Sequence, residues 1–145
     1  MTNPFPGHFP ARQTLMLILV PMLLTFAGQR LYLHLIGVHH IYPAGYLVHH
    51  LFTGTLVVMP AAFVLAFGPR GRKSAIFARL ALGVGSAMIL DEIVYLVATR
   101  ASDSDYVSPL SLQGAAIFIV LAALLLWFLY RCRRCEEQRH PELEA

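Results

Sequence analysis

The chain has 145 residues, of which 57% are hydrophobic and only 13% carry a charge. The apolar residues form four runs of roughly twenty residues each, a length that spans a bilayer core of about 30 Å. No segment outside these runs is long enough to bury a core of its own, which excludes a separate soluble domain. The predicted fold class is therefore all-α, a single four-transmembrane-helix bundle.

The four predicted spans cover residues 14–35, 45–67, 75–99 and 112–130. The first is not expected to be a cleaved signal peptide, because its apolar run continues to Ile36, well past any small-residue cleavage site. In the second, Pro60 should free a backbone carbonyl group that neighbouring helices must accommodate. In the third, Gly83 and Ala87 have the four-residue spacing of small residues that allows close contact between helices.

Positive charge is concentrated after the second and the fourth runs. The residues of these two basic clusters are Arg70, Arg72, Lys73 and Arg79, and Arg131, Arg133, Arg134 and Arg139. Because Lys and Arg mark the cytoplasmic ends of spans, the pattern predicts four crossings of a bacterial inner membrane with both termini cytoplasmic. The net charge of +3 then requires no nucleic-acid partner. Residues 131–145 are expected to form a loosely ordered, charged cytoplasmic tail.

Cys132 and Cys135 form one C-x-x-C pair just after the last run. A structural disulfide is not expected in the reducing cytoplasm. One such pair without a second is a weak signal for zinc binding or redox chemistry. The sequence favours plain or lipidated juxtamembrane cysteines, with a metal site as the alternative.

Ionisable residues gather in a small part of the sequence. Five of the seven histidines lie between positions 34 and 50, and two acidic residues lie inside the third span: His34, His39, His40, His49 and His50, with Asp91 and Glu92. From the helical rise, His49 and His50 should lie about 6–8 Å inside the outer end of the second helix. The two carboxylates should lie about 11–12 Å inside the outer end of the third. Separate segments thus bring ionisable groups to the outer half of the bundle.

A carboxylate at the centre of a bilayer costs about 2.5–3.5 kcal/mol, so both acidic side chains need partners. Histidines, Arg30 and a cation are the candidates. Imidazole and carboxylate groups together bind zinc, iron, manganese or copper. The sequence therefore predicts a divalent transition-metal site with these candidate ligands: His49, His50, Asp91, Glu92, His39, His40 and His34. The structural alternative is a His–carboxylate ion pair that holds the helices in register.

Three further residues are candidates for catalysis. Tyr46 shares a helical face with the His49–His50 pair, and Tyr95 lies one turn beyond the Asp91–Glu92 pair. Either tyrosine would serve as a proton donor, and Arg30 would hold an anionic headgroup. Two alternatives stay open: Arg30 and His34 extend their polar ends to the headgroups, and the His39–His40 pair is a plain interfacial loop.

Two segments carry a resemblance to known proteins. Val48-His49-His50-Leu51-Phe52-Thr53-Gly54 resembles the I-H-H-x-[FY]-x-G segment of a group of small bacterial and archaeal polytopic membrane proteins. The helix from Gly83 to Glu92, which ends in Leu-Asp-Glu, resembles the second recurring segment of that group, a G-x-G...L-D-E helix. The group has no established activity, so the resemblance implies a topology and site positions. The His39–His40 pair is not part of the pattern.

Three functions fit the pattern. The first is a metal-dependent enzyme, a hydrolase that activates water or an oxidoreductase, acting on a lipid-soluble substrate at the non-cytoplasmic face. The second is a proton or ion relay or a transport protein; four short helices would then need to form a homo-oligomer. Few polar residues lie in the inner half, chiefly Thr25 and Ser74, which disfavours a conducting path. The third is an accessory subunit of a larger membrane complex.

Overall fold

The computed structural model describes residues 9–37, 49–69, 71–100 and 102–139. Within these residues, all of the regular secondary structure is helical. The helices that are long and apolar enough to cross a membrane are α1 (Ala11–Ile36), α2 (His50–Phe67), α3 (Arg72–Ala98) and α5 (Pro109–Arg139). A short helix, α4 (Asp103–Tyr106), precedes α5. The predicted all-helical fold with four candidate spans is confirmed.

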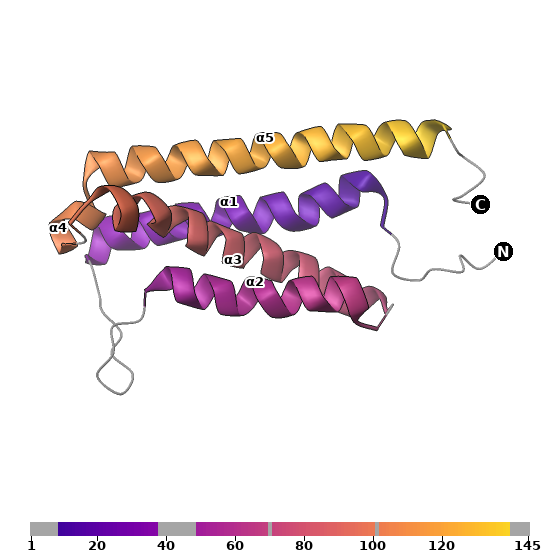
Figure 1. Ribbon diagram of the computed structural model, residues 1–145, viewed down its shortest axis with the longest axis horizontal. Helices are drawn as coiled ribbons and strands as arrows, with labels where there is room; N and C mark the ends of the chain where they lie inside the picture. Colours follow the sequence, from indigo (N-terminus) through magenta and orange to yellow (C-terminus); the bar gives the residue numbers. More distant parts are fainter. Residues whose placement is uncertain (1–8, 38–48, 70, 101, 140–145) are drawn as a thin grey trace.

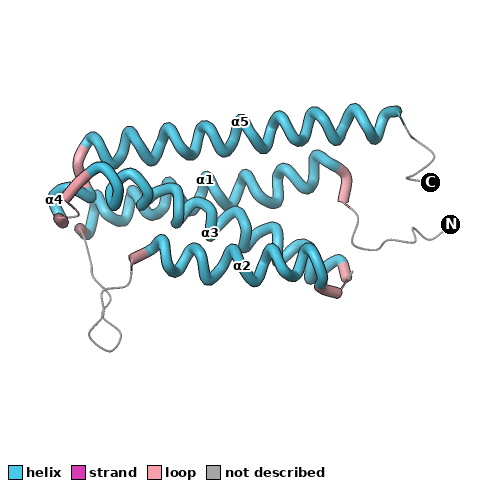
Figure 2. The backbone as a smooth tube through the Cα atoms, viewed as in Figure 1, coloured by secondary structure: helices cyan, strands magenta, loops and turns pink. Residues whose placement is uncertain are grey.

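The four long helices run side by side along the long axis of the molecule (Figure 1). Figure 2 shows the start of α1, the turn between α2 and α3 and the end of α5 at one end of this bundle. We call this end the basic end, because it carries Arg72, Arg79, Arg133 and their neighbours. The opposite end, which holds α4, is called the α4 end. The shared position of the two basic clusters agrees with an even number of crossings, and the assignment of this end to the cytoplasm stays a prediction.

Two helix boundaries differ from the predicted ones. Helix α2 begins at His50, later than predicted, and His49 is its extended N-cap residue. The two histidines therefore lie at the tip of the helix, and the predicted depth of 6–8 Å inside it is wrong. Helix α5 continues to Arg139, so the segment expected to be a loose tail is helical as far as that residue.

Local contacts explain why α5 extends so far. Arg133 and Glu137, one turn apart, form an ion pair with an Nε–Oε1 distance of 3.3 Å. Arg133 also donates a hydrogen bond from Nη2 to the backbone carbonyl of Phe9, at 2.8 Å. These contacts hold the charged segment against the start of α1. Cys132 and Cys135 lie on this helical extension as exposed free cysteines.

Helix α3 is the centre of the bundle and packs against α1, α2 and α5. Its small residues allow this. Gly83 faces the backbone of α1 at Ile18, and Ala87 is fully buried, so the predicted close contact at these two residues is confirmed. A Cβ atom added to Gly85 would lie only 2.7 Å from the carbonyl oxygen of Gly54 in α2. Backbones this close require glycine on both sides.

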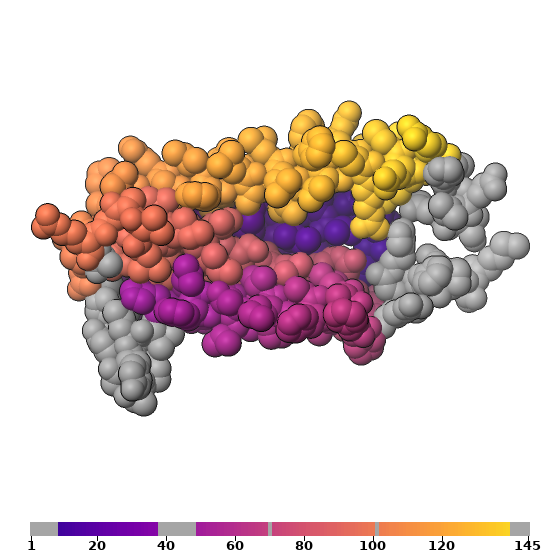
Figure 3. Space-filling model, in the orientation of Figure 1, coloured from indigo at the N-terminus to yellow at the C-terminus, as the bar shows by residue number. Residues whose placement is uncertain are grey.

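The outer surface of the bundle is apolar. Leu24 of α1, Leu56 of α2 and Leu125 of α5 are 68%, 74% and 57% exposed. In the space-filling view α2 and α5 form opposite flanks, with α1 and α3 between them (Figure 3). Side chains of this kind on every flank are typical of a protein whose surface contacts lipid, and a soluble protein rarely exposes apolar patches so large.

We predict that Gly85→Ala destabilises the protein by roughly 1–3 kcal/mol, because the added methyl group must force α2 and α3 apart. Gly28→Ala is the matched control, because a Cβ atom at Gly28 would meet nothing within 4 Å. The control should be neutral or slightly stabilising, since alanine favours a helix over glycine by about 1 kcal/mol. Reversible unfolding in mixed micelles measures both. Equal stability of the two variants would contradict the close approach of α2 and α3.

Candidate functional site

The buried polar side chains of the described residues all lie towards the α4 end. Asp91, Glu92 and Ser111 are between 0% and 2% exposed. The two carboxylates occupy successive positions on α3, about 100° apart around its axis. They therefore point to different neighbours. Because α3 is central, one carboxylate meets α1 and α4 and the other meets the start of α2.

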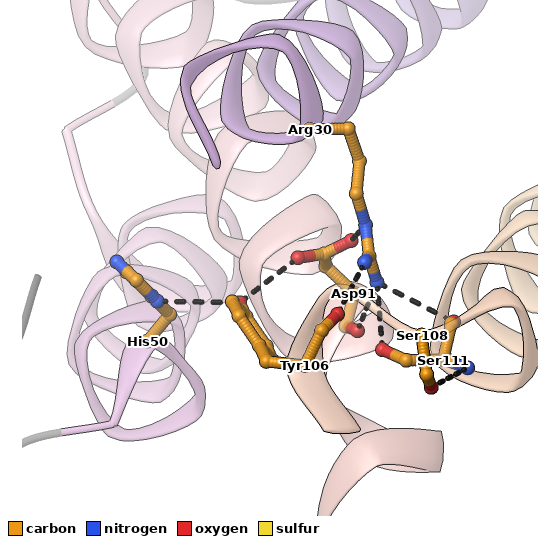
Figure 4. Close-up of polar contacts among 6 residues, drawn as sticks. All are labelled: Arg30, His50, Asp91, Tyr106, Ser108 and Ser111. Atoms are coloured by element: carbon orange, nitrogen blue, oxygen red, sulfur yellow. Dashed lines mark hydrogen bonds and ion pairs between the residues drawn. The ribbon is translucent and has the colours of Figure 1, made fainter. Parts of the chain in front are cut away.

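Asp91 is bound by Arg30 and Tyr106. Nε of Arg30 donates to Oδ1 of Asp91 at 2.5 Å, and the hydroxyl group of Tyr106 donates to Oδ2 at 3.1 Å (Figure 4). The other guanidinium nitrogens of Arg30 donate to the backbone oxygens of Tyr106 and Asp91, each at 3.1 Å, and to Oγ of Ser111 at 3.2 Å. Arg30 thus neutralises the carboxylate and joins α1, α3, α4 and α5. The alternative that its guanidinium extends to the headgroups is wrong.

Glu92 holds the start of α2. Its Oε1 lies 2.8 Å from Nδ1 of His49, and its Oε2 accepts a hydrogen bond from the backbone N–H of Leu51 at 2.5 Å. The His49 side chain forms no cap of its own for α2. The carboxylate of another helix therefore satisfies an N–H group that the first turn leaves unpaired, and its negative charge suits the positive end of the helix dipole. This contact explains why α2 begins at His50.

Tyr106 is one of two residues of this site, with Ser111, that the sequence did not reveal. Helix α4 positions it through a capping box: Oγ of Ser102 accepts from the N–H of Asp105 at 3.3 Å, and Oδ2 of Asp105 accepts from the Ser102 N–H at 3.3 Å. The hydrogen bonds from Ser102 keep the pKa of Asp105 below its usual value. Burial, reinforced by the charge of Asp91, raises the pKa of the Tyr106 phenol, which therefore stays neutral and donates a hydrogen bond. A capping box followed by a single aromatic residue in a polar loop was the available signal.

Tyr106 connects Asp91 to the second histidine. Its hydroxyl oxygen lies 3.5 Å from Nδ1 of His50, and the two rings are nearly parallel with centroids 6.4 Å apart. Because the Tyr106 hydroxyl group donates its hydrogen bond to Asp91, Nδ1 of His50 carries the hydrogen of this contact. The same reasoning places a hydrogen on Nδ1 of His49, which faces the Glu92 carboxylate. Both imidazoles therefore keep Nε2 for another partner.

The structure brings most of the predicted site residues together. They lie in one group, which we call the polar network. Its predicted members are Arg30, His49, His50, Asp91, Glu92 and Tyr95, and its two other members are Tyr106 and Ser111. Tyr95 is 3% exposed and packs edge-on against Tyr106, with centroids 4.6 Å apart.

The other candidates do not belong to the described network. His34 is exposed on the last turn of α1. His39, His40 and Tyr46 lie outside the described residues.

The arrangement of the polar network bears on the metal site. Within the described ranges, no group of three or more His, Cys, Asp or Glu side chains is placed to hold a metal ion. Each carboxylate has protein partners instead, and Glu92 with His49 forms the His–carboxylate pair that was the structural alternative. Counting Arg30 as positive and the two carboxylates as negative, the network carries a formal charge of −1 with neutral histidines. It therefore favours one further positive charge, such as a bound cation.

Comparisons with protein-family models, with curated proteins and with solved structures each give no match to this chain.

We predict that Arg30→Met destabilises the protein by about 3–5 kcal/mol, because Asp91 is left as an unpaired buried charge. The double variant Arg30→Met/Asp91→Leu should be more stable than Arg30→Met alone, since it removes both charges. Arg134→Met, a change at an exposed arginine of α5, is the control and should stay within about 0.5 kcal/mol of wild type. Unfolding in mixed micelles gives all three values. A double variant less stable than the single one would show that the ion pair does not account for the loss.

Proposed function

We propose that this integral membrane protein binds a divalent transition-metal ion at its α4 end through Nε2 of His49 and of His50. In this proposal Glu92 and Asp91 orient the two imidazoles. The observation that carries it is the 2.8 Å contact between Nδ1 of His49 and Oε1 of Glu92. A histidine that binds a metal commonly gives its other ring N–H to a carboxylate, which fixes the tautomer and makes the ligating nitrogen more basic.

The second histidine has the same kind of support through one intervening group. His50 contacts Tyr106, and Tyr106 is bound to Asp91. The two adjacent histidines thus each have a partner at Nδ1. For His49 it is the carboxylate of Glu92, and for His50 it is the hydroxyl group of Tyr106, which is itself bound to Asp91. A pair that served only to hold helices in register would need one such contact, whereas here both imidazoles have a partner at Nδ1, Glu92 at 2.8 Å for His49 and Tyr106 at 3.5 Å for His50.

The charge of the polar network also favours a cation. Arg30 balances one carboxylate, and the other lies at the start of α2 beside His49. A divalent ion near the imidazoles would compensate this remaining negative charge. Zinc, iron, manganese and copper all accept imidazole ligands. His39 and His40 stay candidate ligands from the sequence, and so does direct binding by Asp91 or Glu92.

An enzymatic role would follow from such a site. A metal ion can lower the pKa of a bound water molecule and polarise a substrate oxygen. At the end of a membrane bundle, the substrate class that fits is lipid-soluble, and hydrolysis or oxidation are the candidate reactions. We also propose that the chain belongs to the group of small prokaryotic membrane proteins with the I-H-H-x-[FY]-x-G segment, on the strength of residues 48–54 and 83–92.

A proton or ion relay is the second candidate, favoured by the chain of contacts from Asp91 through Tyr106 to His50. A path across the membrane would need polar side chains along its whole length. In the part of the chain that the structure describes, the buried polar residues gather towards the α4 end. This distribution favours a one-sided site over conduction. An accessory subunit that presents the same site to a larger complex is compatible with it.

The test is elemental analysis of protein purified in a mild detergent without chelators. We expect a stoichiometric transition metal in the wild type and its loss in His49→Ala and His50→Ala. Glu92→Gln should retain the metal with an affinity lowered by about 10–100-fold, the usual effect of removing an orienting partner. The matched control is His34→Ala, which changes an exposed histidine outside the polar network.

Two outcomes would contradict the proposal. Metal retained in both His49→Ala and His50→Ala would exclude these imidazoles as ligands. The other outcome is that the wild-type protein holds no metal, both after gentle preparation and after incubation with each of the four ions. In that case the role of the network is structural, as a His–carboxylate pair that holds the helices in register. Complete loss of metal in Asp91→Asn, with the fold retained, would instead assign that carboxylate as a direct ligand.

A further inference from the structure

The basic end of the bundle holds a second concentration of charge, centred on Phe9. Phe9 lies two residues before the first residue of α1 and is only 3% exposed. Cζ of Arg79 lies 4.7 Å from the centroid of its ring, and Cζ of Arg72 lies 5.9 Å from it. Nη2 of Arg133 donates to its backbone oxygen at 2.8 Å. Arg72, Arg79 and Arg133 thus meet at one residue, and we call them the arginine cluster.

The fold brings these three side chains together. Arg72 and Arg79 are seven residues apart on α3, which places them two turns apart on one face. Arg133 comes from α5 and is held by Glu137, at 3.3 Å, and by Oγ1 of Thr14, at 3.5 Å. Three positive charges gathered around one residue repel one another unless negative charge compensates them.

The described residues supply only part of that compensation. Glu137 is the one carboxylate they place in contact with the arginine cluster, and its Oε1 also accepts from the N–H of Ala11 at 3.0 Å. Three guanidinium groups and one carboxylate leave a formal charge of +2. The cluster therefore has a net positive charge at the level where the spans end.

Arg79 has a donor without an acceptor. Its Nη1 donates to the backbone oxygen of Ala75 at 2.9 Å, whereas its Nε is buried and has no hydrogen-bond partner among the described residues. Leaving a buried donor of a charged group unpaired is unfavourable. An anion with several oxygen atoms would compensate the charge of the cluster and accept from its accessible guanidinium N–H groups.

We propose that the arginine cluster binds the phosphate group of an anionic phospholipid in the leaflet at the basic end. Guanidinium groups match the geometry of phosphate oxygens, and basic pockets between transmembrane helices are suited to anionic headgroups. A lipid is favoured over a soluble phosphate, because the site lies where the candidate spans α1, α3 and α5 have their basic ends and the long helices expose apolar side chains to the surroundings.

The experiment is native mass spectrometry of the purified full chain in detergent, titrated with phosphatidylglycerol, with phosphatidylcholine or with inorganic phosphate. We expect a saturable one-to-one complex with phosphatidylglycerol, binding by phosphatidylcholine at least about fivefold weaker, and no competition by inorganic phosphate at matched concentration. Arg79→Gln and Arg72→Gln should each weaken phosphatidylglycerol binding by about fivefold, the effect of one basic residue near an anionic membrane surface.

Arg134→Gln is the matched control. Arg134 lies next to Arg133 in the sequence, is exposed, and donates to the hydroxyl group of Tyr130. Its loss removes the same charge from the same end of the bundle and should change binding by less than about twofold. If Arg134→Gln weakened binding as much as Arg79→Gln, the lipid would be attracted by the overall charge of the basic end and not bound by the arginine cluster, which would overturn the proposal.

Other results also decide the question. Binding that inorganic phosphate displaces would assign a soluble anion and reject the lipid. Equal affinity for phosphatidylglycerol and phosphatidylcholine would show that the site does not select a negatively charged lipid, and would reject the proposal. If Arg79→Gln fails to fold, Arg72→Gln decides, because Arg72 is exposed. The metal content of the protein is read separately and at the opposite end, so the two proposals can fail independently.

Discussion

The bundle depends on how two carboxylates on its central helix are compensated in an apolar environment. Asp91 is fully buried, and Arg30 of α1 meets it with a direct ion pair while its other nitrogens bind backbone and hydroxyl oxygens of α3, α4 and α5. A single guanidinium group thus joins these helices at one level. Because removing either charge alone would leave the other buried and unpaired, these helices are fixed in their relative height and rotation.

The neighbouring carboxylate acts differently and has a different consequence. Glu92 supplies the N-terminal cap that α2 lacks and binds His49 at the same time. The same carboxylate therefore determines both where α2 starts and how the imidazole of His49 is oriented. Stability and the proposed function are coupled here, since a group that anchors α2 also sets which nitrogen of His49 is available.

The two ends of the bundle have opposite imbalances of charge. At the α4 end, two carboxylates and one guanidinium leave formal negative charge, which suits a cation held by imidazoles. At the basic end, three guanidinium groups and one carboxylate leave formal positive charge, which suits a phosphate. The two proposed ligands, a metal ion and a lipid phosphate, therefore differ in the sign of their charge as the two ends do.

The sequence by itself determined the four spans, the close contact of Gly83 and Ala87, and the gathering of histidines and carboxylates towards one end. Hydrophobic run length and the fixed helical rise determine position along the bundle axis. Only the tertiary structure decided that Asp91 pairs with Arg30 and Glu92 with His49, that Tyr106 links Asp91 to His50, and that α2 starts at His50. These features depend on how each helix is rotated about its own axis. That rotation is set by close packing between helices, at contacts such as Gly54 against Gly85, which a periodic pattern in a nearly uniform apolar sequence does not specify.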